Sequence, residues 1–149
     1  RRGCLYKKAQ ELGCNKIALG HHFDDVIETI LLSMFYGGEF KTMMPKLHST
    51  NFKGMELIRP LYLVKEKDIK DFWDYHKYTF INCACEATKK GNIISKRQEI
   101  KELIIKLRQK SQLIDQNIFK SCEKVRLDTL ISYEKKGEVI SFLDNYKNE

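Results

Sequence analysis

Three acidic side chains, Asp24, Asp25 and Glu28, follow a short apolar run at the start of a helical pattern. Counted from His21, they stand at i+3, i+4 and i+7, so all four residues share one face of the predicted helix. A carboxylate pair at such a junction can hold Mg²⁺ beside a polyphosphate, because hard cations prefer oxygen ligands. The alternative is that acidic residues in a first helical turn only favour the positive end of the helix dipole.

The opposite face of this helix is apolar and is expected to pack on a core. Its members are Phe23, Ile27, Ile30 and Met34. The acidic face is therefore not expected to be core, and alanine substitutions there should leave the fold intact. Adjacent residues of a helix point about 100° apart, which disfavours a zinc site on His21 and His22.

The elements around this segment alternate between strand and helix. Helices are predicted over residues 2–12, 24–35 and 66–78, and strands over 16–19 and 55–60. Pro60 limits the second strand to an edge or makes it the final residue, and residues 39–53 read as irregular and basic. This order predicts an α/β fold, a parallel sheet with flanking helices.

Past residue 85 the pattern becomes helical. Ser95 and Gln98 form a capping box for a helix that reaches about residue 110, and a further helix is predicted over 115–125. Residues 126–149 are ambiguous. We expect two parts, residues 1–85 with the sheet and a helical C-terminal segment over residues 86–149.

Composition narrows the functional class. The chain has 149 residues, a formal charge of +7 and five cysteines, and it holds no apolar run of membrane length. An excess of basic residues favours an anionic partner. Five cysteines without a secretory signal favour a reducing, cytoplasmic setting, and their odd number argues against a closed set of disulfides. The lack of a long apolar run argues against a membrane.

The acidic helix belongs to a longer string, G-H-H-x-D-D-x-x-E-T followed by an apolar run and F-Y-G-G. This string resembles the second signature of the PP-loop ATP pyrophosphatases, and within them the tRNA 2-thiocytidine synthetases. R-R-G-x-L-Y at residues 1–6, M-x-P-K-L at 43–47 and I-R-P-L at 58–61 extend the resemblance. The S-G-G-x-D-S phosphate loop of this superfamily is absent, so the resemblance implies the C-terminal part of a larger, adenine nucleotide α-hydrolase-like enzyme.

The resemblance implies ATP-dependent thiolation of tRNA. ATP adenylates the C2 oxygen of a cytidine, and a sulfur then displaces AMP. The implied roles are catalysis by Asp24, Asp25 and Glu28, Mg²⁺ binding by the two aspartates, and ATP binding by four further residues. Those four are Gly20, His21, Thr29 and Arg1. The implied cofactors are ATP, Mg²⁺ and a 4Fe–4S cluster, and the implied partners are tRNA and a sulfur donor, either a cysteine desulfurase or sulfide, with a homodimer also considered.

Cys83 and Cys85 form a C-x-C pair after Phe80. In the thiolating family a cysteine at this point joins an upstream C-x-x-C to hold the cluster. The spacing F-x-x-C matches Cys83, and Cys85 is the alternative. Two thiols at this spacing cannot complete a metal site alone, and the other interpretation is a pair of small buried apolar side chains.

Contact with RNA is predicted for five basic residues. Basic side chains interleaved with aromatic ones, here Phe40 and Phe52, suit a phosphate backbone and stacked bases. A solvated polar loop has the same composition, so that alternative stays open. The five residues are Arg2, Lys41, Lys46, Lys53 and Arg59.

Two other functions are weighed against thiolation. The lysidine synthetases share H-H-x-D-D-x-x-E-T and also modify tRNA with ATP, but they need no cluster. A non-catalytic RNA-binding or dimerisation module is the alternative of another class. Since the chain lacks the phosphate loop, we expect residues 1–149 alone to be inactive.

Overall fold

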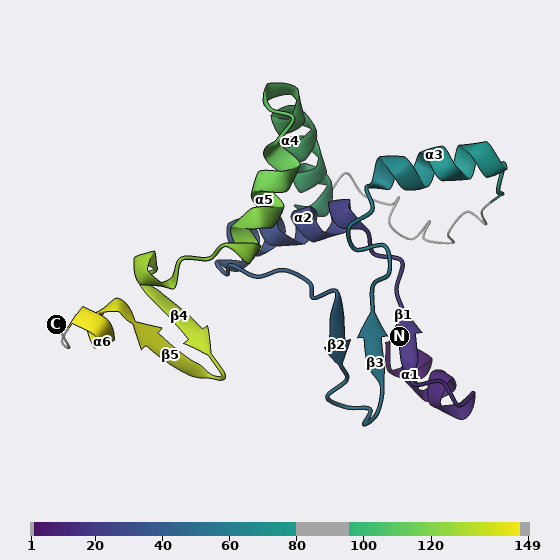
Figure 1. Ribbon diagram of the computed structural model, residues 1–149, viewed down its shortest axis with the longest axis horizontal. Coiled ribbons are helices and arrows are strands. Elements are labelled where there is room, and N and C mark those ends of the chain that lie inside the picture. Colours follow the sequence, from purple (N-terminus) through teal and green to yellow (C-terminus); the bar gives the residue numbers. More distant parts are fainter. Residues whose placement is uncertain (1, 80–95, 147–149) are drawn as a thin grey trace.

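The computed structural model describes residues 2–79 and 96–146, and Figure 1 gives the arrangement of their helices and strands. The N-terminal half holds α1 (Arg2–Glu11), β1 (Lys16–Ala18), α2 (Phe23–Leu32), β2 (Lys46–His48), β3 (Glu56–Ile58) and α3 (Glu66–His76). The C-terminal half holds α4 (Lys96–Lys110), α5 (Ile114–Glu123), β4 (Ser132–Lys135), β5 (Glu138–Ser141) and α6 (Phe142–Tyr146). The predicted α/β class and the three N-terminal helices are confirmed.

The main sheet has the strand order β1-β3-β2. β1 and β3 are parallel, with Ile17 opposite Leu57, as the alternation of elements predicts. β2 is antiparallel to β3 and lies in the segment that was predicted to be irregular. That prediction was wrong for residues 46–48, because three residues are too few to show a strand period and only pairing with β3 defines them.

One prediction was that Pro60 limits β3 to an edge of the sheet, and the structure shows that it does not. β3 is the central strand, and it ends at Ile58, so the proline takes no place in the ladder of hydrogen bonds. The chain then turns twice, through hydrogen bonds from Tyr62 N–H to Arg59 O and from Val64 N–H to Leu61 O. These turns bring the start of α3 back to the start of α2, where Phe23 N–H donates to Val64 O at 2.9 Å.

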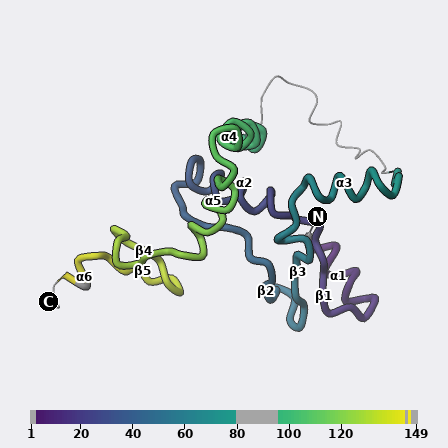
Figure 2. Tube along the Cα trace, turned by 45° about the horizontal axis from the view of Figure 1, so that its top comes forward, coloured from purple at the N-terminus to yellow at the C-terminus, as the bar shows by residue number. Residues whose placement is uncertain are grey.

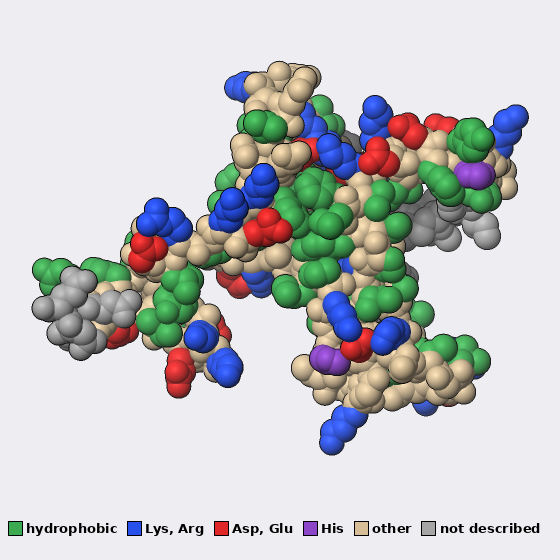
Figure 3. Space-filling view, in the orientation of Figure 1, with side chains coloured by type: hydrophobic (Ala, Val, Ile, Leu, Met, Phe, Trp, Pro, Cys, Tyr) green, Lys and Arg blue, Asp and Glu red, His purple; other side chains and the backbone are tan. Residues whose placement is uncertain are grey.

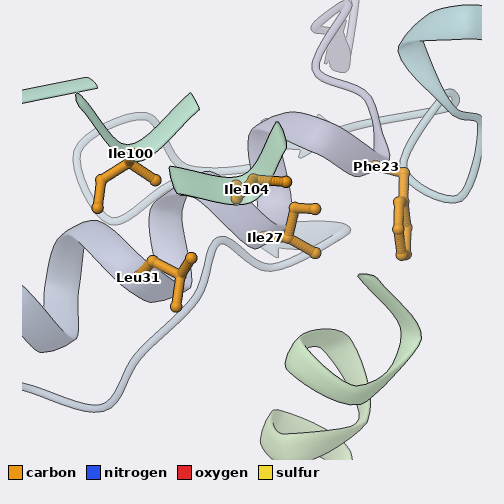
Figure 4. Packing of buried hydrophobic residues seen from close by; sticks show 5 residues of the cluster. All are labelled: Phe23, Ile27, Leu31, Ile100 and Ile104. Carbon is orange, nitrogen blue, oxygen red and sulfur yellow. The ribbon is translucent and has the colours of Figure 1, made fainter. Parts of the chain in front are cut away.

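The larger core lies where α4 and α5 pack on α2. Figure 4 shows its five fully or nearly buried side chains, three from α2 and two from α4. They are Phe23, Ile27 and Leu31 of α2 and Ile100 and Ile104 of α4. Leu103, Ile118 and Phe119 pack against them. These contacts confirm that the apolar face of α2 is core, as its helical spacing predicts, and they add Ile100 and Ile104 of α4 to that core.

Met34 departs from that pattern, since 44% of it is exposed. Regular α-helix ends at Leu32, and a π-helical turn, η1 (Ser33–Gly37), follows before Gly38 stops the helix at φ 63°. A π turn has more residues per turn than an α-helix, so the residues after Ser33 rotate out of the stripe. The helix thus ends at Gly38, close to the predicted residue 35, and the prediction that Met34 is core is wrong.

A smaller core joins α1 to the sheet. Tyr6, Met55 and Leu57 are buried together, and the Phe52 ring stacks on Tyr6 with centroids 4.9 Å apart. One face of the Phe52 ring is therefore covered by this core and is not available to stack on a base.

The C-terminal segment is only partly helical. After α5, a turn, η3 (Leu127–Thr129), leads into a β4–β5 hairpin and α6, and Figures 1 and 2 show that this unit extends away from the rest of the chain. Lys136 and Gly137 have φ of 54° and 85°, as a two-residue hairpin loop requires. The hairpin departs from the expected helical segment. No helix in residues 2–79 or 96–146 is long and apolar enough to cross a membrane.

Candidate functional site

The acidic signature lies at the carboxyl end of β1. Leu19 N–H still donates to Ile58 O of β3, Gly20 is exposed, and His22 takes an extended conformation as the N-cap of α2. Asp25 accepts a hydrogen bond from the backbone N–H of His22 at 3.1 Å, which fixes the first turn of the helix. The chain thus places the signature at the sheet edge where open α/β folds bind ligands.

Asp24 is buried, with 7% of the residue exposed. One carboxylate oxygen accepts the backbone N–H of Glu66 at 2.7 Å, and the other contacts the Arg108 guanidinium. Burial opposes ionisation of Asp24, but the Glu66 N–H and Arg108 outweigh it and hold the pKa of this carboxyl below its usual value. Asp24 therefore ties α2 to the first turn of α3 and to α4.

Asp25 and Glu28 share one partner on α4. Arg97 donates from Nε to Glu28 at 2.7 Å and from Nη2 to Asp25 at 3.1 Å. Lys101 lies 3.6 Å from the other oxygen of Glu28, whose side chain is only 3% exposed. The acidic face of α2 is thus covered by cations of α4.

Arg108 extends this network to α5. Its Nε lies 2.9 and 3.1 Å from the two oxygens of Asp115, which is itself buried. Burial tends to lower the pKa of Arg108, but Asp115 and Asp24 together raise it above its usual value. The guanidinium stays charged and joins α4 to both neighbouring helices.

This geometry corrects the expectation that alanine substitutions on the acidic face leave the fold intact. Asp24 and Glu28 are buried and charge-paired, so alanine at Asp24 removes a contact between three helices. The three basic residues that pair with the face, Arg97, Lys101 and Arg108, were not assigned to it from the sequence. Their spacing of four and seven residues does place them on one face of a helix, so the signal was present.

The same contacts bear on the predicted magnesium site. Within residues 2–79 and 96–146, no group of three or more His, Cys, Asp or Glu side chains could hold a metal ion. Both oxygens of Asp24 are engaged and its side chain is only 10% exposed, so Asp24 does not fit a metal ligand in this arrangement. Both oxygens of Asp25 are also engaged, one by Arg97 and the other by the His22 N–H. The Asp25 side chain is 20% exposed and is the more open of the two predicted ligands.

Two of the predicted ATP-binding residues, Gly20 and His21, lie between β1 and α2, and Thr29 lies within α2. Gly20 is exposed and His21 is half-buried. Thr29 donates its hydroxyl proton to the backbone oxygen of Asp25 at 2.7 Å, so that proton is used within the helix. Arg1 lies outside the described residues.

The cysteines predicted to hold the cluster, Cys83 and Cys85, also lie outside the described residues. Of the other cysteines, Cys4 and Cys14 are exposed, and Cys122 is half-buried. Burial raises the pKa of the Cys122 thiol, which keeps it protonated and weakly reactive.

The residues predicted to contact RNA differ in burial, and Figure 3 shows Lys and Arg side chains spread over several parts of the visible face. Arg59 is buried, and its guanidinium donates to the backbone oxygen of Met44, so it holds the loop before β2. Lys41, Lys46 and Lys53 are exposed. Lys41 pairs with Glu39, and Lys46 lies 3.3 Å from Glu56. The side chain of Arg2 is not described.

Comparison with known proteins identifies the family. A model of the PP-loop domain matches residues 1–108, which include the sheet, the acidic signature and most of α4. The chain belongs to the PP-loop family. The match confirms the resemblance to the PP-loop ATP pyrophosphatases.

Three curated relatives of this chain share the same name. The chain is 42% identical over 125 residues to a tRNA-cytidine(32) 2-sulfurtransferase of Alcanivorax borkumensis, covering 84% of this chain and 43% of that protein. It is 47% identical over 104 residues to the protein of that name from Aeromonas hydrophila, covering 70% and 33%. With the Coxiella burnetii protein it shares 39% over 134 residues, covering 90% and 51%. The chain thus spans about half or less of the length of these curated relatives.

Proposed function

We propose that the protein containing this chain is an ATP-dependent tRNA sulfurtransferase that converts a cytidine of tRNA to 2-thiocytidine. The observation that carries the proposal is the 42% identity over 84% of the chain with a tRNA-cytidine(32) 2-sulfurtransferase. The name of that relative points to the cytidine at position 32 as the substrate.

The chemistry proceeds in two steps. The cytidine C2 oxygen attacks the α-phosphorus of ATP and pyrophosphate leaves, which makes that oxygen part of a good leaving group. A sulfur nucleophile then adds at C2 and AMP departs with the original oxygen. The first step builds charge on phosphate oxygens, and the N-terminus of α2 is where the helix dipole favours an anion.

The residues of this chain supply position and charge around that step. Gly20 and His21, between β1 and α2, are the proposed contacts to the nucleotide, with Thr29 in the second turn of the helix. Asp25, the more open carboxylate of the predicted pair, is the one that we retain as a ligand for Mg²⁺ accompanying ATP. Its side chain is 20% exposed, whereas that of Asp24 is 10% exposed and paired to Arg108.

An iron–sulfur cluster is the second proposed cofactor. When bound, it would supply an open iron for a sulfide or sulfur donor, and Cys83 would be one of its protein ligands, with Cys85 as the alternative. Soft thiolates suit iron–sulfur clusters, and a hydroxyl is a poor replacement for them. The proposed partners are tRNA, bound in part by Lys41, Lys46 and Lys53, and a sulfur donor.

The experiment that tests the proposal measures pyrophosphate release by the full-length protein with ATP, Mg²⁺ and unmodified tRNA. Release is expected only when tRNA is present, because the tRNA base is the group that is adenylated. A tRNA whose target cytidine is replaced by uridine is the matched control. Release that ignores this replacement, or that requires lysine instead of a sulfur donor, would contradict the proposal.

A further inference from the structure

Arg97 of α4 bridges two carboxylates of α2 that stand three residues apart. Its Nε donates to Glu28 at 2.7 Å and its Nη2 to Asp25 at 3.1 Å. Like charges three apart on a helix repel each other, so the pair needs a shared cation to stay together. Lys101 adds a second cation, 3.6 Å from the other oxygen of Glu28.

Exposure separates the members of this bridge. The Glu28 side chain is 3% exposed, that of Asp25 is 20% exposed and that of Arg97 is 46% exposed. Glu28 therefore anchors the guanidinium from inside, while Asp25 lies at the boundary with solvent. Asp25 is also held by the backbone N–H of His22 at 3.1 Å, so its two oxygens are directed from two sides.

We infer that Arg97 is a positioning residue of the site, which fixes Asp25 at the start of α2 through the anchor on Glu28. The inference rests on the proposed function, since it says which residue orients the carboxylate that we retain there. An arginine is suited to this task because its planar fork reaches two carboxylates at once. A lysine ammonium is a point charge and holds one of them well.

The expected effect lies in the rate of the reaction and not in binding. A misplaced group near reacting atoms costs about 100-fold in rate. In the full-length protein, Arg97→Gln should therefore lower kcat for 2-thiocytidine formation by about 10- to 100-fold. The KM values for ATP and tRNA should change little. Arg97→Lys, which keeps the charge and one contact, should restore part of kcat.

The matched control is Lys106→Gln on the same helix. Lys106 is exposed and, in the part of the chain that the structure describes, it has no ion pair. This control should keep kcat and KM at wild-type values. An equal loss in Lys106→Gln and Arg97→Gln would mean that the total charge of α4 matters, and that result would overturn the inference.

A double-mutant cycle separates positioning from direct contact with substrate. In an Asp25→Asn, Glu28→Gln background, adding Arg97→Gln should cost less than twofold in kcat, because the groups through which it acts are already altered. A full additional loss would show that Arg97 acts on substrate by itself and would refute the inference. Should Arg97→Gln not fold, the same cycle with Arg97→Lys gives the answer.

The failure of the proposed function has a different signature. A wild-type protein that forms no 2-thiocytidine refutes the function and, with it, this role of Arg97. An active wild type with an additive cycle refutes the role of Arg97 alone. Melting temperatures of the same variants check that the ion pair exists. The losses of melting temperature caused by the Arg97 and Glu28 substitutions should sum to more than the loss in the double variant.

Discussion

Substitution of Asp24 by alanine should destabilise the chain, because Asp24 links three helices from a buried position. The change removes the acceptor for the Glu66 N–H at the start of α3 and one of the two carboxylates that contact Arg108. Arg108 would then keep only Asp115. The sequence pattern alone predicts an intact fold for this variant. Unfolding measurements therefore distinguish a structural role of Asp24 from a role on the surface only.

The magnitude follows from what each partner retains. Removing one member of a fully buried ion pair costs about 3–5 kcal/mol, and leaving a buried hydrogen-bonding group unpaired costs about 1–3 kcal/mol. The Arg108 side chain is 38% exposed and keeps two contacts to Asp115, which places the loss at the low end of the first range. We therefore expect Asp24→Ala to lower the free energy of unfolding by about 3 kcal/mol. Asp24→Asn, which can still accept from the Glu66 N–H, should lose about 1 kcal/mol.

Thermal and urea unfolding of the 149-residue chain measure this loss. At about 2–4 °C per kcal/mol for a chain of this size, Asp24→Ala should lower the melting temperature by about 9 °C and Asp24→Asn by about 3 °C. Asp128→Ala is the control, since Asp128 pairs with Arg126 on the surface, with side chains 66% and 75% exposed. A melting temperature for Asp24→Ala within 1 °C of wild type, by the same scaling, would refute the structural role of Asp24.

Three further predictions concern the core, pH and the cluster. Ile104→Ala should lower the free energy of unfolding by about 3 kcal/mol in urea titrations, because Ile104 is 3% exposed in the main core, whereas the exposed neighbour Ile105 should tolerate alanine within about 0.5 kcal/mol. The pKa of Asp24 is lowered in the folded chain, so its contribution to the free energy of unfolding is present above the unfolded pKa of about 3.9. That contribution is lost as the pH falls through the folded pKa. Acid titrations followed by circular dichroism should therefore show a steeper loss of stability for wild type than for Asp24→Asn. Anaerobic reconstitution of the full-length protein should give less iron and sulfide for Cys83→Ser than for Cys122→Ser, and equal iron contents in the two variants would contradict the assignment of Cys83.

The helices were predictable because their periodicity is local. The stripe of Phe23, Ile27 and Ile30 follows from the 3.6-residue repeat, and all three residues are buried. Met34 was not predictable in the same way, because the π-helical turn changes the repeat after Ser33 without a marker in the sequence. β2 was missed for a related reason, since its three residues become a strand only by pairing with β3.

The acidic residues of the candidate site could be predicted from the sequence, but their cationic partners could not. Spacing alone places Asp24, Asp25 and Glu28 on one face, and the structure keeps them there. Their cationic partners lie 69 to 84 residues further along the chain, and no spacing rule connects two helices across that distance. Burial was the other missing quantity: Arg59 looks like a basic surface residue in the sequence, yet it is 8% exposed.

The central claim is that the protein containing this chain transfers sulfur to cytidine in tRNA. The direct measurement is mass spectrometry of nucleosides from unmodified tRNA after incubation with the full-length protein, ATP and a sulfur donor. The expected product is 2-thiocytidine, formed only when both ATP and the sulfur donor are present. Lysidine as the product, or no modified nucleoside with a protein that carries its cluster and binds ATP, would contradict it.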